Sequence, residues 1–95
     1  MSTRDAYLEK MKAQIDEWNA EIEKIEAKAR GAQADAKIEY EKQLGTMRLQ
    51  REKLRERMRD VNEANEDAFE SLRESVENAW DELAKGFRDA LNKYR

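Results

Sequence analysis

Apolar side chains recur along residues 8–36 at alternating steps of three and four residues, the spacing of a heptad seam. The series begins at Leu8, ends at Ala36 and has Trp18 as its largest member. Side chains with this average spacing line one edge of a helix, and that edge needs another helix to cover it. The rest of the chain must therefore continue this seam or fold back over it. The seam members that precede the alanines are Leu8, Met11, Ile15, Trp18, Ile22 and Ile25.

The composition also favours a long helix or coiled coil. Charged residues make up 43% of the 95 residues and aromatic residues 7%, and there is no proline, cysteine or histidine. A chain of this length has room for only a small core of its own, and a narrow seam buries little area per helix. We therefore expect a homo-oligomer in which further chains complete the core.

No stretch of the sequence has the length of a secretion signal or a membrane span. Apolar runs do not exceed three residues, and Met1 is followed directly by polar and charged residues. Without cysteine there is neither a disulfide framework nor thiol chemistry. We expect a cytoplasmic protein.

The apolar phase predicts a first helix over residues 3–62. Five of residues 27–36 are alanine, with Gly31 among them, and such small side chains allow close helix packing. The seam passes Gly45 without losing phase, and one glycine costs a helix only about 1 kcal/mol. We interpret Gly45 as a weak point of the helix, although it remains the alternative position for a turn. The heptads that follow include Leu54, Met58 and Val61.

A break in the helix is predicted at residues 62–65. Asn65, followed by Glu66 and Asp67, has the pattern of an N-cap with an acidic first turn. Beyond it the apolar spacing changes to an eleven-residue rhythm, which gives a broad, straight apolar face. We predict a second helix over residues 66–94 and hence a coiled-coil hairpin. Its apolar face comprises Phe69, Leu72, Val76, Trp80, Leu83, Phe87, Leu91 and Tyr94.

Charge changes sign across this break. Residues 47–59 carry a local charge of +4 and residues 60–82 one of −8. Glutamates four residues apart in the acidic block repel one another along one helical face. A turn at 62–65 is predicted to relieve this repulsion by bringing the two blocks together. The predicted pairing sets Glu66, Glu70 and Glu74 beside Arg59, Arg55 and Arg51.

Catalytic and ligand-binding chemistry has little basis in the sequence. Nucleophilic catalysis needs a base beside the nucleophile, and without histidine we interpret Ser71 and Ser75 as a polar flank. Carboxylate-bridged metal sites in helical bundles use Glu-x-x-His pairs, so the acidic residues are interpreted as solvated surface. Residues 48–59 match a DNA-contacting helix in charge only, since Glu52 and Glu56 would lie among the phosphates. We expect no cofactor, no metal and no nucleic-acid partner.

Two further alternatives concern large apolar residues. The amphipathic stretch 69–94 is compatible with reversible binding to a lipid surface, but such helices usually carry more Lys and Arg than this one. Trp18 and Trp80 are interpreted as core residues of a multi-helix bundle, with binding hot spots as the alternative.

Three stretches carry a resemblance to a known family. They are YLEKMKAQIDEWNAE at 7–21, ADAKIEYE at 34–41 and VENAWD at 76–81. Together they resemble short bacterial coiled-coil proteins labelled stress-response proteins. The resemblance implies a small, soluble, cytoplasmic, all-helical protein without known catalysis. Gly31 and Gly45 depart from the family pattern.

The sequence thus predicts an all-α coiled-coil hairpin that assembles into a helical bundle. We expect a non-enzymatic structural or interaction protein that acts through helix–helix association. The alternative is lipid-surface binding through residues 69–94. The identity of the partner, the stoichiometry and the strand orientation are left open.

Overall fold

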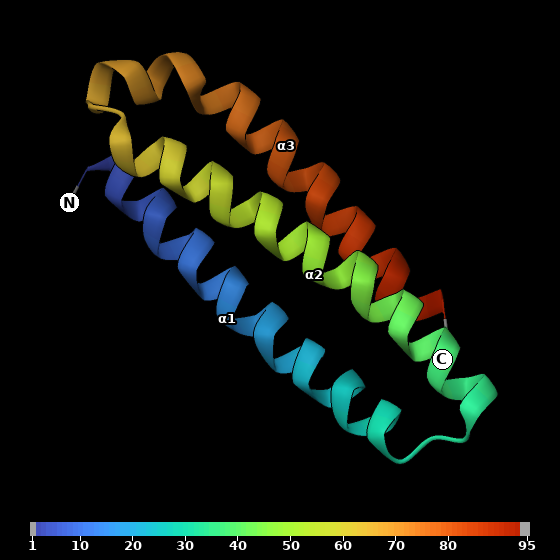
Figure 1. The fold of residues 1–95 in the computed structure, drawn as a ribbon. Coiled ribbons are helices and arrows are strands. Elements are labelled where there is room, and N and C mark those ends of the chain that lie inside the picture. The colour runs from blue at the N-terminus through green and yellow to red at the C-terminus, as the bar shows by residue number, and fades with distance from the viewer. Residues whose placement is uncertain (1, 94–95) are drawn as a thin grey trace.

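Three helices follow one another in the chain, joined by two short turns. In this computed structural model, which describes residues 2–93, they are α1 (Thr3–Arg30), α2 (Ala34–Glu63) and α3 (Glu66–Lys93). Each helix reverses the direction of the one before it, so α1 and α3 run parallel (Figure 1). The Cα positions extend over 52 × 19 × 17 Å. The described residues contain no strand, and the predicted all-α class is correct.

The predicted continuous helix over residues 3–62 is wrong, because the chain turns at residues 31–33. Gly31 caps α1, its N–H donating to the Ala29 carbonyl, and Gln33 starts α2 from an extended conformation without a side-chain cap. The heptad spacing of apolar residues continues through this turn because its members there are alanines. Alanine favours neither burial nor exposure strongly, so the spacing does not require a helix. Ala29 is buried, whereas Ala36 faces solvent beyond the turn.

The second turn lies where the sequence predicts it. Helix α2 ends at Glu63 and α3 begins at Glu66. The Asn65 side chain accepts a hydrogen bond from the Ala68 N–H at 2.7 Å, which confirms it as the N-cap. Arg4 of α1 donates to the Ala64 carbonyl at 2.6 Å and so ties the first helix to this turn. Gly45 lies within α2, as predicted. Tyr94, the predicted end of the second helix, lies outside the described residues.

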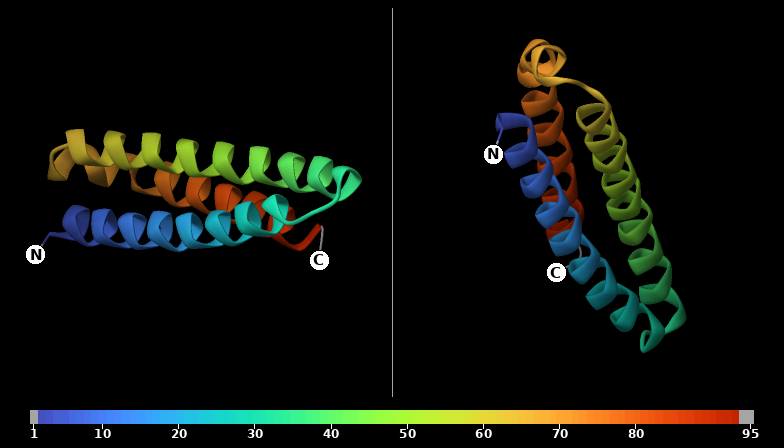
Figure 2. Two further views of the ribbon diagram at one scale, coloured as in Figure 1. Left: turned by 60° about the horizontal axis from the view of Figure 1, so that its bottom comes forward. Right: turned by 90° about the vertical axis from the view of Figure 1, so that its left-hand side faces the viewer.

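Helix α2 packs against both other helices (Figure 2), while few backbone positions of α1 and α3 lie close together. Its buried stripe includes Leu44, Met47, Leu54 and Val61, spaced to face both neighbours. Gln43 is also buried, and its amide donates to two carbonyls in the last described turns of α3. One thin stripe therefore organises the whole bundle.

Most of the predicted seam lies inside this single chain. The prediction that Leu72 belongs to the buried seam is wrong. Its side chain is 39% exposed, because the flank of α3 that it shares with Ala68 and Ser75 faces solvent. Four members are partly buried against the core, namely Leu8, Met58, Trp80 and Leu91. The buried members are Met11, Ile15, Trp18, Ile22, Ile25, Leu54, Val61, Phe69, Val76, Leu83 and Phe87.

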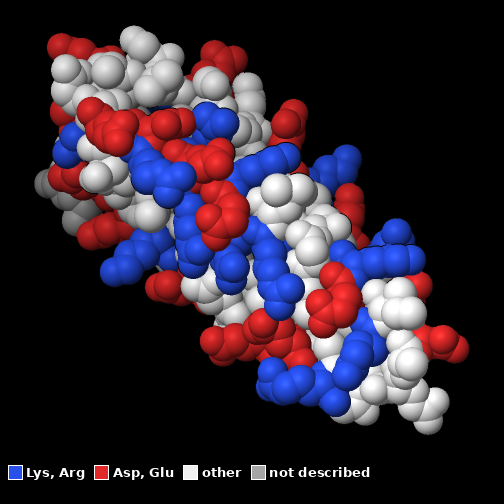
Figure 3. Space-filling model, in the orientation of Figure 1, with Lys and Arg blue, Asp and Glu red and all other residues white. Residues whose placement is uncertain are grey.

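The predicted pairing between the basic block of α2 and the glutamates of α3 is also wrong. Arg48 pairs with Glu26 of α1 at 2.8 Å, and Arg51 donates to Asn19 of α1 at 3.0 Å. These arginines lie on the flank of α2 that faces α1. The prediction missed this flank because it did not include the first turn, which places α1 beside α2. On the face that carries α2, Lys and Arg side chains form a band with acidic residues between them (Figure 3).

Two glycines give a test of this packing. Gly45→Ala should stabilise the protein by about 1 kcal/mol, because alanine favours the helix and a Cβ there meets no atom within 4 Å. Gly86→Ala should stabilise it less, since its Cβ would lie 2.8 Å from Nε2 of Gln50. In a Gln50→Ala background the Gly86→Ala gain should return. Urea unfolding measures all three effects, and equal gains at both glycines would show that the Gln50 side chain does not crowd position 86.

Candidate helix-binding groove between α1 and α3

A groove runs between α1 and α3, the two parallel helices that are joined mainly through side chains. It contains two hollows, which we name after their aromatic residues. The Tyr7 hollow has a volume of about 320 Å³ and the Trp18 hollow one of about 270 Å³. The Tyr7 hollow is lined by Tyr7, Lys10, Gln14, Glu77, Trp80, Asp81 and Ala84. The Trp18 hollow is lined by Gln14, Glu17, Trp18, Glu21, Ala84, Phe87, Arg88 and Leu91.

The two hollows repeat at a distance of seven residues on both helices. On α1, the positions of Tyr7, Lys10 and Gln14 recur in the second hollow as Gln14, Glu17 and Glu21. On α3, all four lining positions of the Tyr7 hollow recur seven residues later in the Trp18 hollow. Gln14 and Ala84 belong to both hollows and form the low saddle between them. The groove therefore has the heptad repeat of a surface that receives a helix in knobs-into-holes packing.

A stacked aromatic pair forms the floor of the Trp18 hollow. The rings of Trp18 and Phe87 lie 4.4 Å apart and are inclined by only 5°. Both residues are buried, so the pair fixes the spacing of α1 and α3 at this level. Such a pair adds about 0.5–1.5 kcal/mol to the stability beyond the area that it buries.

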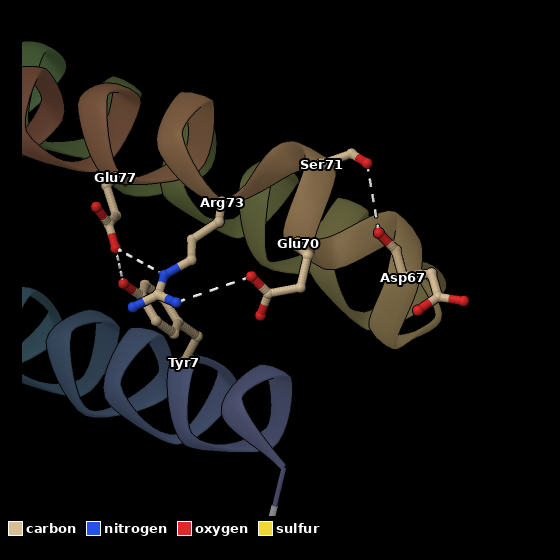
Figure 4. Close-up of polar contacts among 6 residues, drawn as sticks. All are labelled: Tyr7, Asp67, Glu70, Ser71, Arg73 and Glu77. Atoms are coloured by element: carbon tan, nitrogen blue, oxygen red, sulfur yellow. Dashed lines mark hydrogen bonds and ion pairs between the residues drawn. The ribbon is translucent and has the colours of Figure 1, made fainter.

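A polar cluster around Tyr7 joins the two helices at the other end of the groove (Figure 4). The Tyr7 hydroxyl donates to Oε1 of Glu77, which also accepts from Nε of Arg73 at 3.3 Å. Arg73 lies over the Tyr7 ring at 5.7 Å and pairs with Glu70 at 3.8 Å. Lys10 lies over the same ring at 6.0 Å. These contacts hold the Tyr7 side chain in place on the wall of its hollow.

Tyr7 also belongs to an aromatic cluster. Its ring lies 5.2 Å from Phe69 and 6.5 Å from Trp80, the second contact being edge-on at 69°. Phe69 is buried, whereas Trp80 is half-buried and faces the Tyr7 hollow. The open side of Trp80 leaves apolar surface available to a partner.

Charged side chains of both signs line the rim of the groove. Four carboxylates and two cations line the hollows, and two of the carboxylates have a cation partner outside the lining: Glu21 pairs with Lys24 at 3.7 Å and Glu77 with Arg73 at 3.3 Å. Asp81 makes no hydrogen bond or ion pair with any residue from 2 to 93. The lining acids are Glu17, Glu21, Glu77 and Asp81, and the lining cations are Lys10 and Arg88.

The predicted seam accounts for the large apolar residues of the groove but not for its other lining residues. Of the seam residues, Trp18, Trp80, Phe87 and Leu91 line the hollows. Most of the other lining residues were missed because they are polar or small and flank the apolar positions. The signal that was available is heptad spacing: Tyr7, Gln14 and Glu21 on α1 are matched by Glu77 and Ala84 on α3, a series that the seam residue Leu91 continues.

The serines and carboxylates considered in the sequence have ordinary surroundings. Residues 2–93 contain no group of three or more acidic side chains placed to hold a metal ion. Ser71 donates to the backbone carbonyl of Asp67 at 3.4 Å, within α3 itself (Figure 4). Among the helices described, none is both long and apolar enough to cross a membrane.

Comparisons of the chain with models of protein families, with curated proteins and with solved structures give no match. The resemblance to stress-response coiled-coil proteins therefore stays a prediction.

The two tryptophans are expected to differ in their contribution to stability. Trp18→Ala should destabilise the protein by about 3–5 kcal/mol, because the side chain is 4% exposed and stacks on Phe87. Trp80→Ala should cost roughly half as much, since part of its ring faces solvent. Chemical unfolding of each variant measures the difference. Equal losses at both sites would mean that Trp80 is a core residue and not a wall of the groove.

Proposed function

We propose that this chain is a non-enzymatic interaction protein that acts through helix–helix association at the groove between α1 and α3. The observation that carries the proposal is the seven-residue repeat of the two hollows. A heptad-spaced pair of holes matches the side chains on one face of a helix and matches little else. A small-molecule pocket would instead be a single, more enclosed cavity.

A designed peptide tests the docking. A fluorescently labelled helix with leucines at positions i and i+7 and glutamines at the flanking positions should bind and raise its anisotropy. Moving the second leucine to i+5 should weaken binding at least about tenfold, because only one hollow is then filled in a helix of 3.6 residues per turn.

Ala84 provides the matched control, because it lies in both hollows. Ala84→Gln should abolish binding by filling the saddle, whereas Ala20→Gln, an exposed change on α1, should leave it unchanged. If no peptide of any flanking charge binds the wild-type protein, the proposed function is wrong.

Homo-oligomerisation is a second proposal, and it no longer rests on a seam that other chains must cover. Because the chain covers most of its own seam, the surface available for self-association is the outer face of α2. Ile38 is 55% exposed and Leu49 53% exposed, and they lie eleven residues apart, hence on one side of the helix. They lie about 16 Å apart along the helix and so offer two separate apolar contacts, which suits a weak association between copies.

Sedimentation equilibrium tests this second proposal. At micromolar concentrations, the wild-type protein should have a mass above that of one chain. Leu49→Glu should return it to the mass of one chain, whereas Ala13→Glu on the exposed face of α1 should not. A wild-type protein with the mass of a single chain would contradict the proposal.

Lipid-surface binding through residues 69–94 is the weaker alternative. Five residues of α3 are buried in the bundle, so this helix would have to leave its neighbours before its apolar face met a membrane. Binding of the intact chain in a vesicle flotation experiment would be needed to support it. A stress-related role and a cytoplasmic location are proposed from sequence features alone.

A further inference from the structure

We propose that α1 exchanges between two copies of this chain, so that each α1 packs on α2 and α3 of the other copy. In this dimer the turn at residues 31–33 opens, and α1 and α2 of one chain join into a single helix. Such a domain swap gives a two-fold dimer that keeps the contacts of the closed chain. The inference goes beyond the proposed function, because it involves neither the groove nor the exposed apolar residues of α2.

The turn at residues 31–33 is held by few contacts. Within residues 2–93, no side chain of residues 31–36 makes a hydrogen bond or an ion pair. Gln33 and the three residues that follow it are exposed, and a Cβ added at Gly31 meets no atom within 4 Å. The turn lies at one end of the bundle, where α1 and α2 meet (Figure 1). Side chains therefore do little to keep it closed.

The backbone of this turn is compatible with a helix. No residue from 2 to 93 has a positive φ. Gly31, at φ −93° and ψ 2°, lies near the helical region, and Gln33 combines a helical φ of −72° with an extended ψ of 164°. A helix through the turn would also pair backbone groups that have no partner within their own helix at the ends of α1 and α2.

The contacts between α1 and α2 have the register that a two-fold dimer needs. Arg48 pairs with Glu26 and Arg51 donates to Asn19, and the midpoints of these pairs in the sequence are residues 37 and 35. Because both midpoints lie beside the turn, two straight antiparallel helices keep the same pairs when a two-fold axis passes there. The pairs then join different chains.

The heptad spacing supports the straight helix. The seam passes from Ala29 through Ala32 to Ala36 without losing phase. Ala36 is exposed in the closed chain. In the straight helix these three residues would lie on one edge, close to the two-fold axis, where small side chains let the two copies approach. The same stripe thus serves the closed chain and the dimer.

Concentration decides between the two forms. Both contain the same contacts of α1 with α2 and α3, but the short turn gives α1 an effective concentration of the order of mM beside its own chain. The closed chain is therefore favoured at low concentration. Conversion is slow, because α1 must leave the bundle before it exchanges. The contact proposed for the outer face of α2 needs no such opening and equilibrates fast.

Variants of the turn should shift the balance in opposite directions. Gly31→Ala together with Gln33→Ala raises helix propensity at both hinges of the dimer and should lower its dissociation constant at least about tenfold. Ala34→Pro should prevent the swap. Proline suits the first position of α2 and the extended Gln33 before it, but it would break a continuous helix.

Refolding at high concentration measures this balance. Each variant is unfolded in urea, refolded at about 0.5 mM, close to the effective concentration, and separated by size-exclusion chromatography directly after dilution. All chains carry Leu49→Glu, which removes the contact proposed for the outer face of α2. Gly45→Ala is the matched control, because it raises helix propensity within α2 in both forms and should leave the dimer fraction unchanged.

An intrachain distance identifies the swapped form. The chain has no cysteine of its own, so Ala20→Cys and Lys53→Cys place two spin labels at exposed sites of α1 and α2. Labelled chains are refolded with an excess of unlabelled chains. In the closed chain the labels lie on neighbouring antiparallel helices, whereas the continuous helix of the dimer separates them by about 50 Å.

Three results would overturn the swap. They are a dimer with only the short intrachain distance, no dimer from the alanine variant, and a proline variant that forms as much dimer as the wild type. None of them bears on helix docking in the groove, which the peptide titration tests separately.

Discussion

The arrangement of the helices depends on one thin apolar stripe on α2 that serves two neighbours at once. Leu44, Met47, Leu54 and Val61 are the apolar residues that α2 buries, so α1 and α3 both settle against the same narrow edge. Two helices that share such an edge meet each other only through their largest side chains, here Tyr7, Trp18 and their partners on α3. The groove follows from this constraint, because the aromatic side chains hold α1 and α3 apart and fill only part of the space between them.

The sequence predicts the second turn of this fold but not the first, for a physical reason. At residues 62–65, the N-cap, the acidic first turn and the change of apolar rhythm all agree, and the Asn65 cap confirms them. At residues 31–33 no such agreement exists. Gly31 terminates α1 at a negative φ, and Gln33 starts α2 without a side-chain cap. Alanines carry the heptad phase across the gap, and a methyl group costs little whether it is buried or exposed.

The error at the first turn explains the error in the charge pairing. A two-helix hairpin has a single interface, so opposite charges on its two arms can only meet there. A third helix gives α2 two flanks, and Arg48 and Arg51 lie on the flank that faces α1. The heptad spacing of the groove residues is present in the sequence, but the distance between α1 and α3, which are not adjacent in the chain, is not. Of the lining residues, Trp18, Trp80, Phe87 and Leu91 belong to the predicted seam.

Ala84 connects stability with the proposed function. It lies between Trp80 and Phe87 on α3, at a half-buried position where a bundle selected for stability alone would carry a larger apolar residue. A leucine there would extend over the saddle and bury more apolar area, at about 25 cal/mol for each Å² removed from water. It would also obstruct both hollows. Natural proteins often forgo stability where a binding surface needs space, and a small residue at the point shared by two repeated holes fits that pattern. The polar Gln14 stands opposite on α1, so neither side of the saddle fills the groove from within.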